Sequence, residues 1–172
     1  MKSAYRLIAM LSFCLLLTGG VEAQHQNESR PLDRQASSSK PVSPQVEYLT
    51  AERTRPLPFS DAVRVDHMLY LSGQIGTDSS FALVTGGVKA ETRQVMENIR
   101  RILDRHGSSL NQVVKCTVML ADMSEWGAVN EVYVTYFAKD RLPARSALGA
   151  NGLALSARVE IECWATVSRN LN

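Results

Sequence analysis

Apolar and polar positions alternate between strand-like and helix-like spacing along most of the chain. Ala62–Val65 and residues 68–72 are short apolar runs separated by Asp66 and His67, and this spacing predicts a β-hairpin. A loop with several glycines follows at 76–87. Residues 89–106 then place apolar side chains at helical intervals, with Arg, Glu and Gln on the opposite side, which predicts an amphipathic helix.

The next part of the pattern predicts a strand and a second helix. Gly107 is a natural end for the first helix, and β-branched residues dominate Val113–Leu120. Asp122 and Glu125 form a capping-box pattern at the start of the second helix. The expected apolar side of this helix consists of Met123, Trp126, Val129, Val132, Tyr133 and Tyr136.

Two strand-like runs, at 145–148 and 157–167, complete the order ββαβαββ. This order indicates an α+β fold, in which a mixed β-sheet has both helices packed on one face. The other face of the sheet is then bare of helices. A bare apolar face on so small a domain indicates self-association.

The first 23 residues have the layout of a secretory signal peptide. Lys2 and Arg6 precede an apolar run at 7–17, and the small residues Val21 and Ala23 fit cleavage after Ala23. The apolar run is short for a membrane span, and no second one follows it. A helix that stays attached as an anchor is the alternative.

Residues 24–45 are rich in Pro, Ser and Gln and have few apolar side chains. Such a segment buries too little surface to offset its ordering entropy, so we expect a flexible linker. The folded domain is expected at 46–172. Export would place the mature protein in the periplasm of a Gram-negative bacterium, or outside the cell otherwise, and we expect no membrane contact after cleavage.

Composition and charge then narrow the function classes. The chain has 172 residues, of which 45% are hydrophobic and 21% charged, which suits one globular domain and not a disordered protein. The 19 Lys and Arg residues nearly balance the 17 Asp and Glu residues, giving a formal charge of +2. This balance offers no electrostatic reason to expect nucleic acid as a partner.

Cleavage of the signal would remove Cys14 and leave Cys116 and Cys163, both in strand-like apolar runs. Outside the reducing cytosol these two could in principle pair. Because cysteine is often a small buried hydrophobe, we favour two unpaired buried side chains.

Standard cofactor and metal motifs are absent from the sequence. There is no GxGxxG or GxxxxGK[ST] pattern to hold a nucleotide phosphate, so no cofactor is expected. His25, His67 and His106 have no Cys or carboxylate at ligand spacing, so no metal site is expected.

Charged residues in two strand-like runs are the strongest sign of chemistry. Arg145 begins one run, and Glu160 and Glu162 lie on the same face of the other. Charge inside a strand is costly unless it is paired or used. A planar guanidinium suits a small carboxylate, and a nearby carboxylate can position or deprotonate a water. A structural ion pair, across the sheet or between subunits, is the alternative.

The chain also contains six characteristic segments: PFSDAVRVDHMLYLSGQIG (58–76), ETRQVMENIRRIL (91–103), GSSLNQVVKCTVMLADM (107–123), AVNEVYVTYF (128–137), PARS (143–146) and VEIECWA (159–165). In these segments and their order, it resembles the YjgF/RidA family of reactive intermediate (enamine/imine) deaminases. The resemblance implies a chorismate-mutase-like α+β fold and a homotrimer whose sheets pack into a central barrel. It also implies active-site clefts between subunits.

The same resemblance assigns roles to individual residues. Arg145 matches the family's carboxylate-binding arginine, and Glu160 matches its water-activating glutamate. Asn130 matches a helix asparagine that shapes the cleft. The strand formed by Ser72, Gly73, Gln74 and Ile75 lines that cleft, and glycine there permits close approach of a ligand.

The implied activity is hydrolysis of small carboxylate-bearing enamines or imines, such as 2-aminoacrylate, to a 2-keto acid and ammonia without a cofactor. Phe59 stands near the cleft where tyrosine is common, and Ala147 stands where cysteine is common, so the substrate can differ. One alternative is a non-catalytic module that binds small carboxylates or keto acids as a sensor or scavenger. Another is a protein-protective or ribonuclease-like role.

Overall fold

The computed structural model of the protein describes residues 43–51 and 57–167. Within these residues one domain contains two α-helices and a seven-stranded sheet. The elements are β1 (Val46–Leu49), β2 (Ala62–Val65), β3 (Met68–Leu71), β4 (Gln74–Ile75), α1 (Gly87–Arg105), β5 (Val113–Leu120), α2 (Trp126–Tyr133), β6 (Ala144–Gly149) and β7 (Val159–Thr166).

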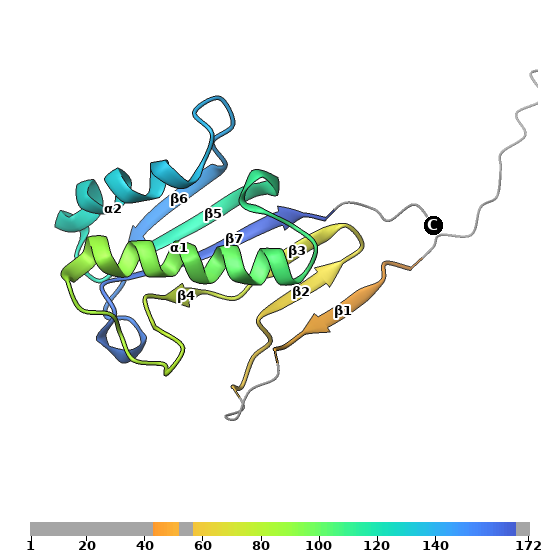
Figure 1. Cartoon of the computed structure of the whole chain (residues 1–172), viewed down its shortest axis with the longest axis horizontal. Helices are drawn as coiled ribbons and strands as arrows, with labels where there is room; N and C mark the ends of the chain where they lie inside the picture. Colours follow the sequence, from red (N-terminus) through yellow and green to blue (C-terminus); the bar gives the residue numbers. More distant parts are fainter. Residues whose placement is uncertain (1–42, 52–56, 168–172) are drawn as a thin grey trace, which may run out of the picture. The chain divides into compact units, whose positions relative to one another are not determined.

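The sheet is mixed, and its strand order is β1-β2-β3-β7-β5-β6, with β4 paired to β7. The β5–β6 pair is parallel, while the other pairs are antiparallel. Figure 1 shows α1 and α2 on the same side of this sheet. The predicted α+β architecture is therefore confirmed.

The core lies between the helices and the sheet. Along α1, the buried apolar side chains follow the helical spacing read from the sequence: Val88, Val95, Met96, Ile99, Ile102 and Leu103. Gly107 has a φ of 75°, a left-handed conformation that favours glycine, and it ends the helix as predicted. In β5 and β7 alternate residues are buried, because successive side chains of a strand point to opposite faces.

The second helix differs in part from the prediction. The Asp122 carboxylate accepts a hydrogen bond from the backbone N–H of Ser124, as an N-cap does, but a short 3-10 turn comes before α2. Met123 and Trp126 were expected on the buried side, yet they are 41% and 43% exposed. Met123 lies against Gly149 at the end of the edge strand β6, where no further strand of the described sheet covers it.

Two strands escaped the hydrophobic pattern. Val46–Leu49 has mostly exposed side chains, so it has no periodic apolar face, and it is a strand because its backbone pairs with β2. β4 has only two residues, too few for a period. The predicted signal peptide and nearly all of the predicted linker lie outside the described residues. In the described part, no helix is long and apolar enough to cross a membrane.

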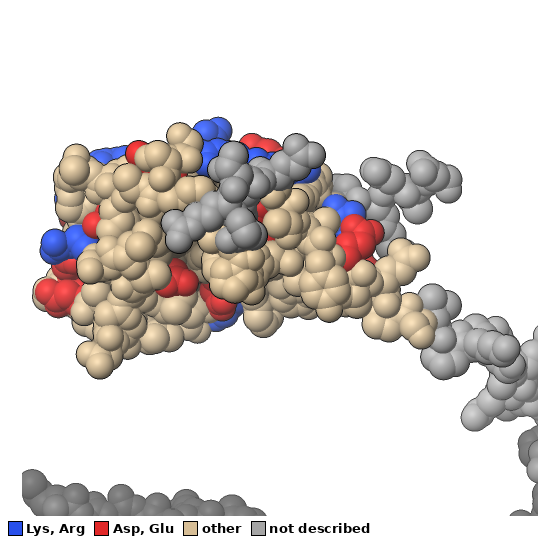
Figure 2. Space-filling view, turned by 90° about the horizontal axis from the view of Figure 1, so that it is seen from below, with Lys and Arg blue, Asp and Glu red and all other residues tan. Residues whose placement is uncertain are grey.

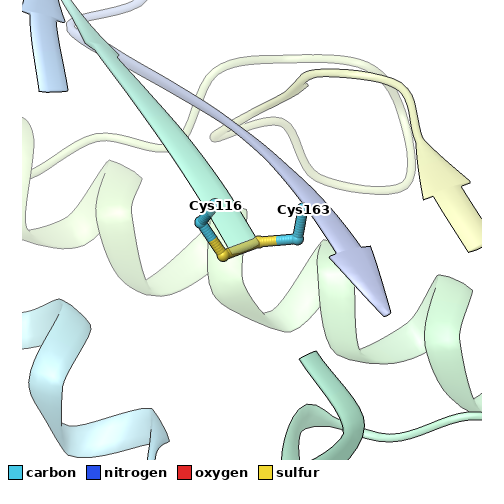
Figure 3. Close-up of a disulfide and its surroundings, with 2 residues drawn as sticks. All are labelled: Cys116 and Cys163. Carbon is cyan, nitrogen blue, oxygen red and sulfur yellow. A yellow bond between two sulfur atoms is a disulfide. The ribbon is translucent and has the colours of Figure 1, made fainter. Parts of the chain in front are cut away.

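The preference for two unpaired cysteines is wrong. Cys116 of β5 and Cys163 of β7 form a disulfide that links the two strands (Figure 3). Both are fully buried, as expected, but they also lie directly opposite each other in the antiparallel register. Opposed residues in such a pair have close Cβ atoms, which allows the bond, and the register is not visible in the sequence.

Candidate active site

Glu160 lies on β7, the central strand, and its side chain points to the face without helices. The buried residues Val159 and Ile161 on either side of it face the core, so alternation directs Glu160 and Glu162 the other way. Glu160 is opposite Ile75 of β4 and Met119 of β5 in the sheet register. The prediction that both glutamates share one face is confirmed.

Gly73 lies directly against the Glu160 carboxylate. A Cβ atom at Gly73 would be 2.0 Å from Glu160 Oε1 and 2.9 Å from its Cδ, so only glycine leaves room for the carboxylate in this position. The backbone around Gly73 is held by its neighbours. The Ser72 hydroxyl donates to the Ser60 carbonyl oxygen (2.7 Å), and Gln74 Nε2 donates to the carbonyl oxygens of Ser72 and Gly73 (both 3.1 Å).

The start of β7 is fixed by a buried carboxylate of α1. Glu91 Oε2 accepts a hydrogen bond from the backbone N–H of Arg158 (2.8 Å), two residues before Glu160. The Arg158 guanidinium pairs in turn with Glu125, which therefore does not complete the expected capping box. These contacts hold the strand from which Glu160 projects.

The surroundings of Glu160 disfavour its charged form. Partial burial raises the pKa of this carboxyl above its ordinary value, and the nearby charge of Glu162 raises it further. A carboxyl with a raised pKa accepts and returns a proton more readily near neutral pH than an ordinary surface glutamate.

Phe59 is half exposed and lines the same cavity as Gly73. This cavity of about 440 Å³ is also lined by Gln74 and Ile75 and by Asn98 and Arg101 of α1, while Glu160 is not among its lining residues. Phe59 and Gly73 were both predicted as site residues, so the structure brings these two together. We call Glu160, Gly73, Ser72 and Phe59 the glutamate cluster.

Arg145 belongs to a second cluster, between β6 and α2. It is opposite Cys116 in the parallel β5–β6 register and therefore shares the helix-covered face with that buried residue. Its guanidinium carbon lies 4.8 Å from the centroid of the Tyr133 ring, a cation–π contact. Behind it, the Tyr133 ring packs on Phe137 with centroids 4.9 Å apart.

Two polar atoms of α2 lack hydrogen-bond partners among the described residues, and one of them belongs to the tyrosine that contacts Arg145. Within the residues that the structure describes, Arg145 has no ion pair and no hydrogen-bonded acceptor. The Tyr133 hydroxyl and Asn130 Oδ1 are buried and have no hydrogen-bond partner. Burial raises the pKa of Tyr133 to about 12, with Arg145 opposing the shift, so the phenol stays protonated. We call Arg145, Tyr133 and Asn130 the arginine cluster.

The two clusters do not meet within one chain. Arg145 projects from the helix-covered face of the sheet, whereas Glu160 projects from the bare face. The structure thus groups the predicted residues into two halves. Tyr133 was not predicted as a site residue, because its helical spacing fits a core position equally well. The signal that could have indicated it is its position three residues after Asn130, which places both residues on the same side of the helix.

The remaining surface adds little charge to either cluster. On the face of the domain that Figure 2 shows, Lys and Arg form no continuous patch. In the described part of the chain, no group of three or more His, Cys, Asp or Glu residues could hold a metal ion.

These observations define a small α+β protein whose candidate site is divided between the two faces of one mixed sheet. A sequence model described as Endoribonuclease L-PSP matches residues 52–167. The chain therefore belongs to this family, which is the YjgF/RidA family that the sequence segments indicated.

Relatives and solved structures agree with this assignment. Over 109 residues the chain is 50% identical to a mouse protein and 47% identical to a human protein, each named 2-iminobutanoate/2-iminopropanoate deaminase. These matches cover 63% of this chain and 80% and 79% of those proteins. RidA from an Antarctic Psychrobacter is similar with 37% identity and a TM-score of 0.62, over 70% of this chain and 94% of that one. Yeast Mmf1 is similar with 30% identity and a TM-score of 0.67, and the match covers 72% of this chain and 100% of that one.

Proposed function

We propose that the protein is an enzyme that hydrolyses 2-imino acids, such as 2-iminobutanoate and 2-iminopropanoate, to 2-keto acids and ammonia. Its close relatives bear the name of this activity. The observation that supports it most is the half-buried guanidinium of Arg145, which lies against the Tyr133 ring and has no carboxylate partner among the described residues. Such a group is suited to bind the carboxylate of a small substrate.

The chemistry follows from the two clusters. Arg145 binds the substrate carboxylate through two parallel N–H donors and so fixes the position of the imine carbon. Glu160 orients a water, accepts its proton as the water oxygen bonds to that carbon, and passes the proton to the nitrogen. The hydroxyl proton of the resulting carbinolamine then moves to the amino nitrogen as the C–N bond breaks, which releases ammonia and leaves the carbonyl of the 2-keto acid. No step needs a cofactor.

We propose that the complete site forms between two copies of the chain, one giving the arginine cluster and the other the glutamate cluster. The opposite orientations of Arg145 and Glu160 support this arrangement. The bare sheet face also supports association, because it carries a row of largely apolar side chains. These residues are register partners on the adjacent strands β1, β2, β3 and β7: Tyr48, Val63, Tyr70 and Trp164. The homotrimer with a central barrel remains the assembly that we expect.

We also propose that the protein is exported after cleavage at Ala23. The Cys116–Cys163 disulfide supports this proposal, because structural disulfides persist in oxidising compartments and are rare in the cytosol. N-terminal sequencing of the protein isolated from its native cells tests it. A mature chain that begins at Gln24 is expected, and a cytosolic chain that retains residues 1–23 would refute export.

The test of the activity uses an imine generated in situ from an amino acid, with release of 2-keto acid as the measurement. We expect the Arg145→Ala and Glu160→Gln variants to lose about 100-fold or more in kcat/KM. Arg100→Ala and Glu131→Gln are matched controls, because both side chains lie in exposed ion pairs outside the clusters, and they should retain full activity.

The outcomes separate the possible functions. A wild-type protein that is no faster than buffer would rule out the deaminase. Binding of keto acids without turnover would indicate a non-catalytic binding module instead. Degradation of RNA that persists in Arg145→Ala would indicate a different activity at a different site.

A further inference from the structure

Tyr133 of α2 is buried beside Arg145, and the mechanism above gives it no role. Its side chain is only 3% exposed, its ring contacts the guanidinium, and its hydroxyl has no hydrogen-bond partner in the described structure. We infer that Tyr133 is a second binding residue for the substrate carboxylate, with its ring positioning Arg145 and its hydroxyl donating a hydrogen bond to the ligand. The identity of the ligand as a 2-imino or 2-keto acid rests on the proposed function.

The ring is suited to hold the guanidinium in place. A cation over an aromatic face is attracted by the ring quadrupole, and more strongly where water is excluded. Phe137 packs behind Tyr133 and restricts its movement. The contact uses none of the N–H donors of Arg145 in a hydrogen bond, so the planar guanidinium fork remains available for a bidentate carboxylate.

The hydroxyl is a buried donor that lacks an acceptor. Native proteins pair nearly all buried polar groups, so an unpaired one calls for a functional explanation. A carboxylate bound by Arg145 would supply the missing acceptor. The phenol stays protonated throughout the neutral range, because burial raises the pKa of Tyr133 to about 12. It is therefore available as a donor throughout that range.

The unpaired side-chain oxygen of Asn130 supports the same interpretation. It lies one helical turn before Tyr133, and its Oδ1 is a buried acceptor without a donor. The arginine cluster thus offers donors from Arg145 and Tyr133 and an acceptor from Asn130. A 2-imino acid offers the complementary set, a carboxylate that accepts and an imine N–H that donates.

The half-buried Tyr136 provides a matched control, because it is a tyrosine in the 3-10 turn that directly follows α2 and its hydroxyl donates to the Arg93 carbonyl oxygen. Three quantities are measured for Tyr133→Phe, Tyr133→Leu and Tyr136→Phe. Calorimetry gives the Kd for 2-oxobutanoate, steady-state kinetics gives KM and kcat for imine hydrolysis, and thermal unfolding gives Tm. We expect Tyr133→Phe to raise Kd and KM about tenfold, as loss of one hydrogen bond to a charged ligand does, with kcat within about twofold.

Thermal unfolding separates this role from a purely structural one. Tyr133→Phe should not lower Tm, since the hydroxyl has no partner in the free protein. Tyr133→Leu should weaken binding further, because the ring contact to Arg145 is also lost. Tyr136→Phe should match the wild type in Kd and KM.

The inference and the proposed function fail in different ways. If the wild type binds 2-oxobutanoate and Tyr133→Phe weakens it but no imine is hydrolysed, the inference stands and the deaminase fails. If the imine is hydrolysed and Tyr133→Phe has wild-type Kd and KM, the inference is overturned alone. A protein that does not bind 2-oxobutanoate, or a Tyr133→Phe variant with weaker binding and an equally lowered Tm, also overturns it.

Discussion

The contact between Gly73 and Glu160 permits a quantitative prediction. In Gly73→Ala the new Cβ would lie 2.0 Å from Glu160 Oε1, whereas ordinary contacts begin at 3.4 Å. The carboxylate must therefore move by about 1.4 Å, because the backbone at position 73 is fixed by its neighbours and the glutamate side chain is flexible. The backbone of Gly73 is not in the left-handed region, so alanine fits its conformation.

We expect this displacement to affect activity far more than stability. A misplacement of about 1 Å in a reacting group can lower the rate about 100-fold, so kcat/KM for imine hydrolysis should fall by that factor. The free energy of unfolding should change by less than about 1 kcal/mol, since only the end of a side chain is displaced. Imine hydrolysis and urea unfolding of the same preparation measure the two effects.

Gly127→Ala is the matched control, because Gly127 lies in α2 with open space around its Cβ position. This variant should keep wild-type activity and gain about 0.5–1 kcal/mol of stability from better helix propensity. Wild-type kcat/KM in Gly73→Ala would refute the reasoning. A loss of several kcal/mol in its unfolding free energy would also refute it, since the defect would then be structural.

Three further changes test other parts of the account. Glu162→Gln removes a charge that raises the pKa of Glu160, so the acid limb of kcat/KM should move to lower pH. A raised pKa means that the native state holds the proton of Glu160 more tightly than the unfolded chain does, which lowers stability at a pH where the unfolded carboxyl is ionised. Lowering that pKa should therefore increase the stability of the variant more at pH 7 than at pH 4. An unshifted limb would contradict the assignment. Replacing Cys116 and Cys163 by alanine should cost about 4 kcal/mol by loop entropy in urea unfolding, given their separation of 47 residues, and a cost below about 1 kcal/mol would contradict a stabilising disulfide. Arg145→Lys cannot bind a carboxylate bidentately, so KM should rise about tenfold while kcat changes less; an unchanged KM would exclude Arg145 from carboxylate binding.

Local patterns in the sequence predicted the local structure well. The helical spacing that ends at Gly107 gave α1 to within two residues at its start, and the β-branched run Val113–Leu120 is the observed strand β5. Apolar periodicity works for these elements because each buries one face against the same core. It failed for Met123 and Trp126, which are exposed, and Met123 lies against Gly149 of the edge strand β6.

The site could be predicted only in part, because its geometry depends on pairing between distant strands. The charge pattern and the resemblance both indicated Arg145 and Glu160, but only the register of β5 with β6 and β7 places them on opposite faces. Register, likewise, sets Cys116 against Cys163. Periodicity assigned Tyr133 to the core, and its role appears only once the guanidinium is seen on its ring.

The central claim is that each active site needs Arg145 from one copy of the chain and Glu160 from another. Mixing the Arg145→Ala and Glu160→Gln variants tests it directly, since each is expected to be inactive alone. If equal amounts are unfolded together and reassembled at random, about one quarter of the composite sites receive both intact residues. Recovery of about one quarter of wild-type activity is therefore expected. Activity no greater than the sum of the two separate variants would contradict it.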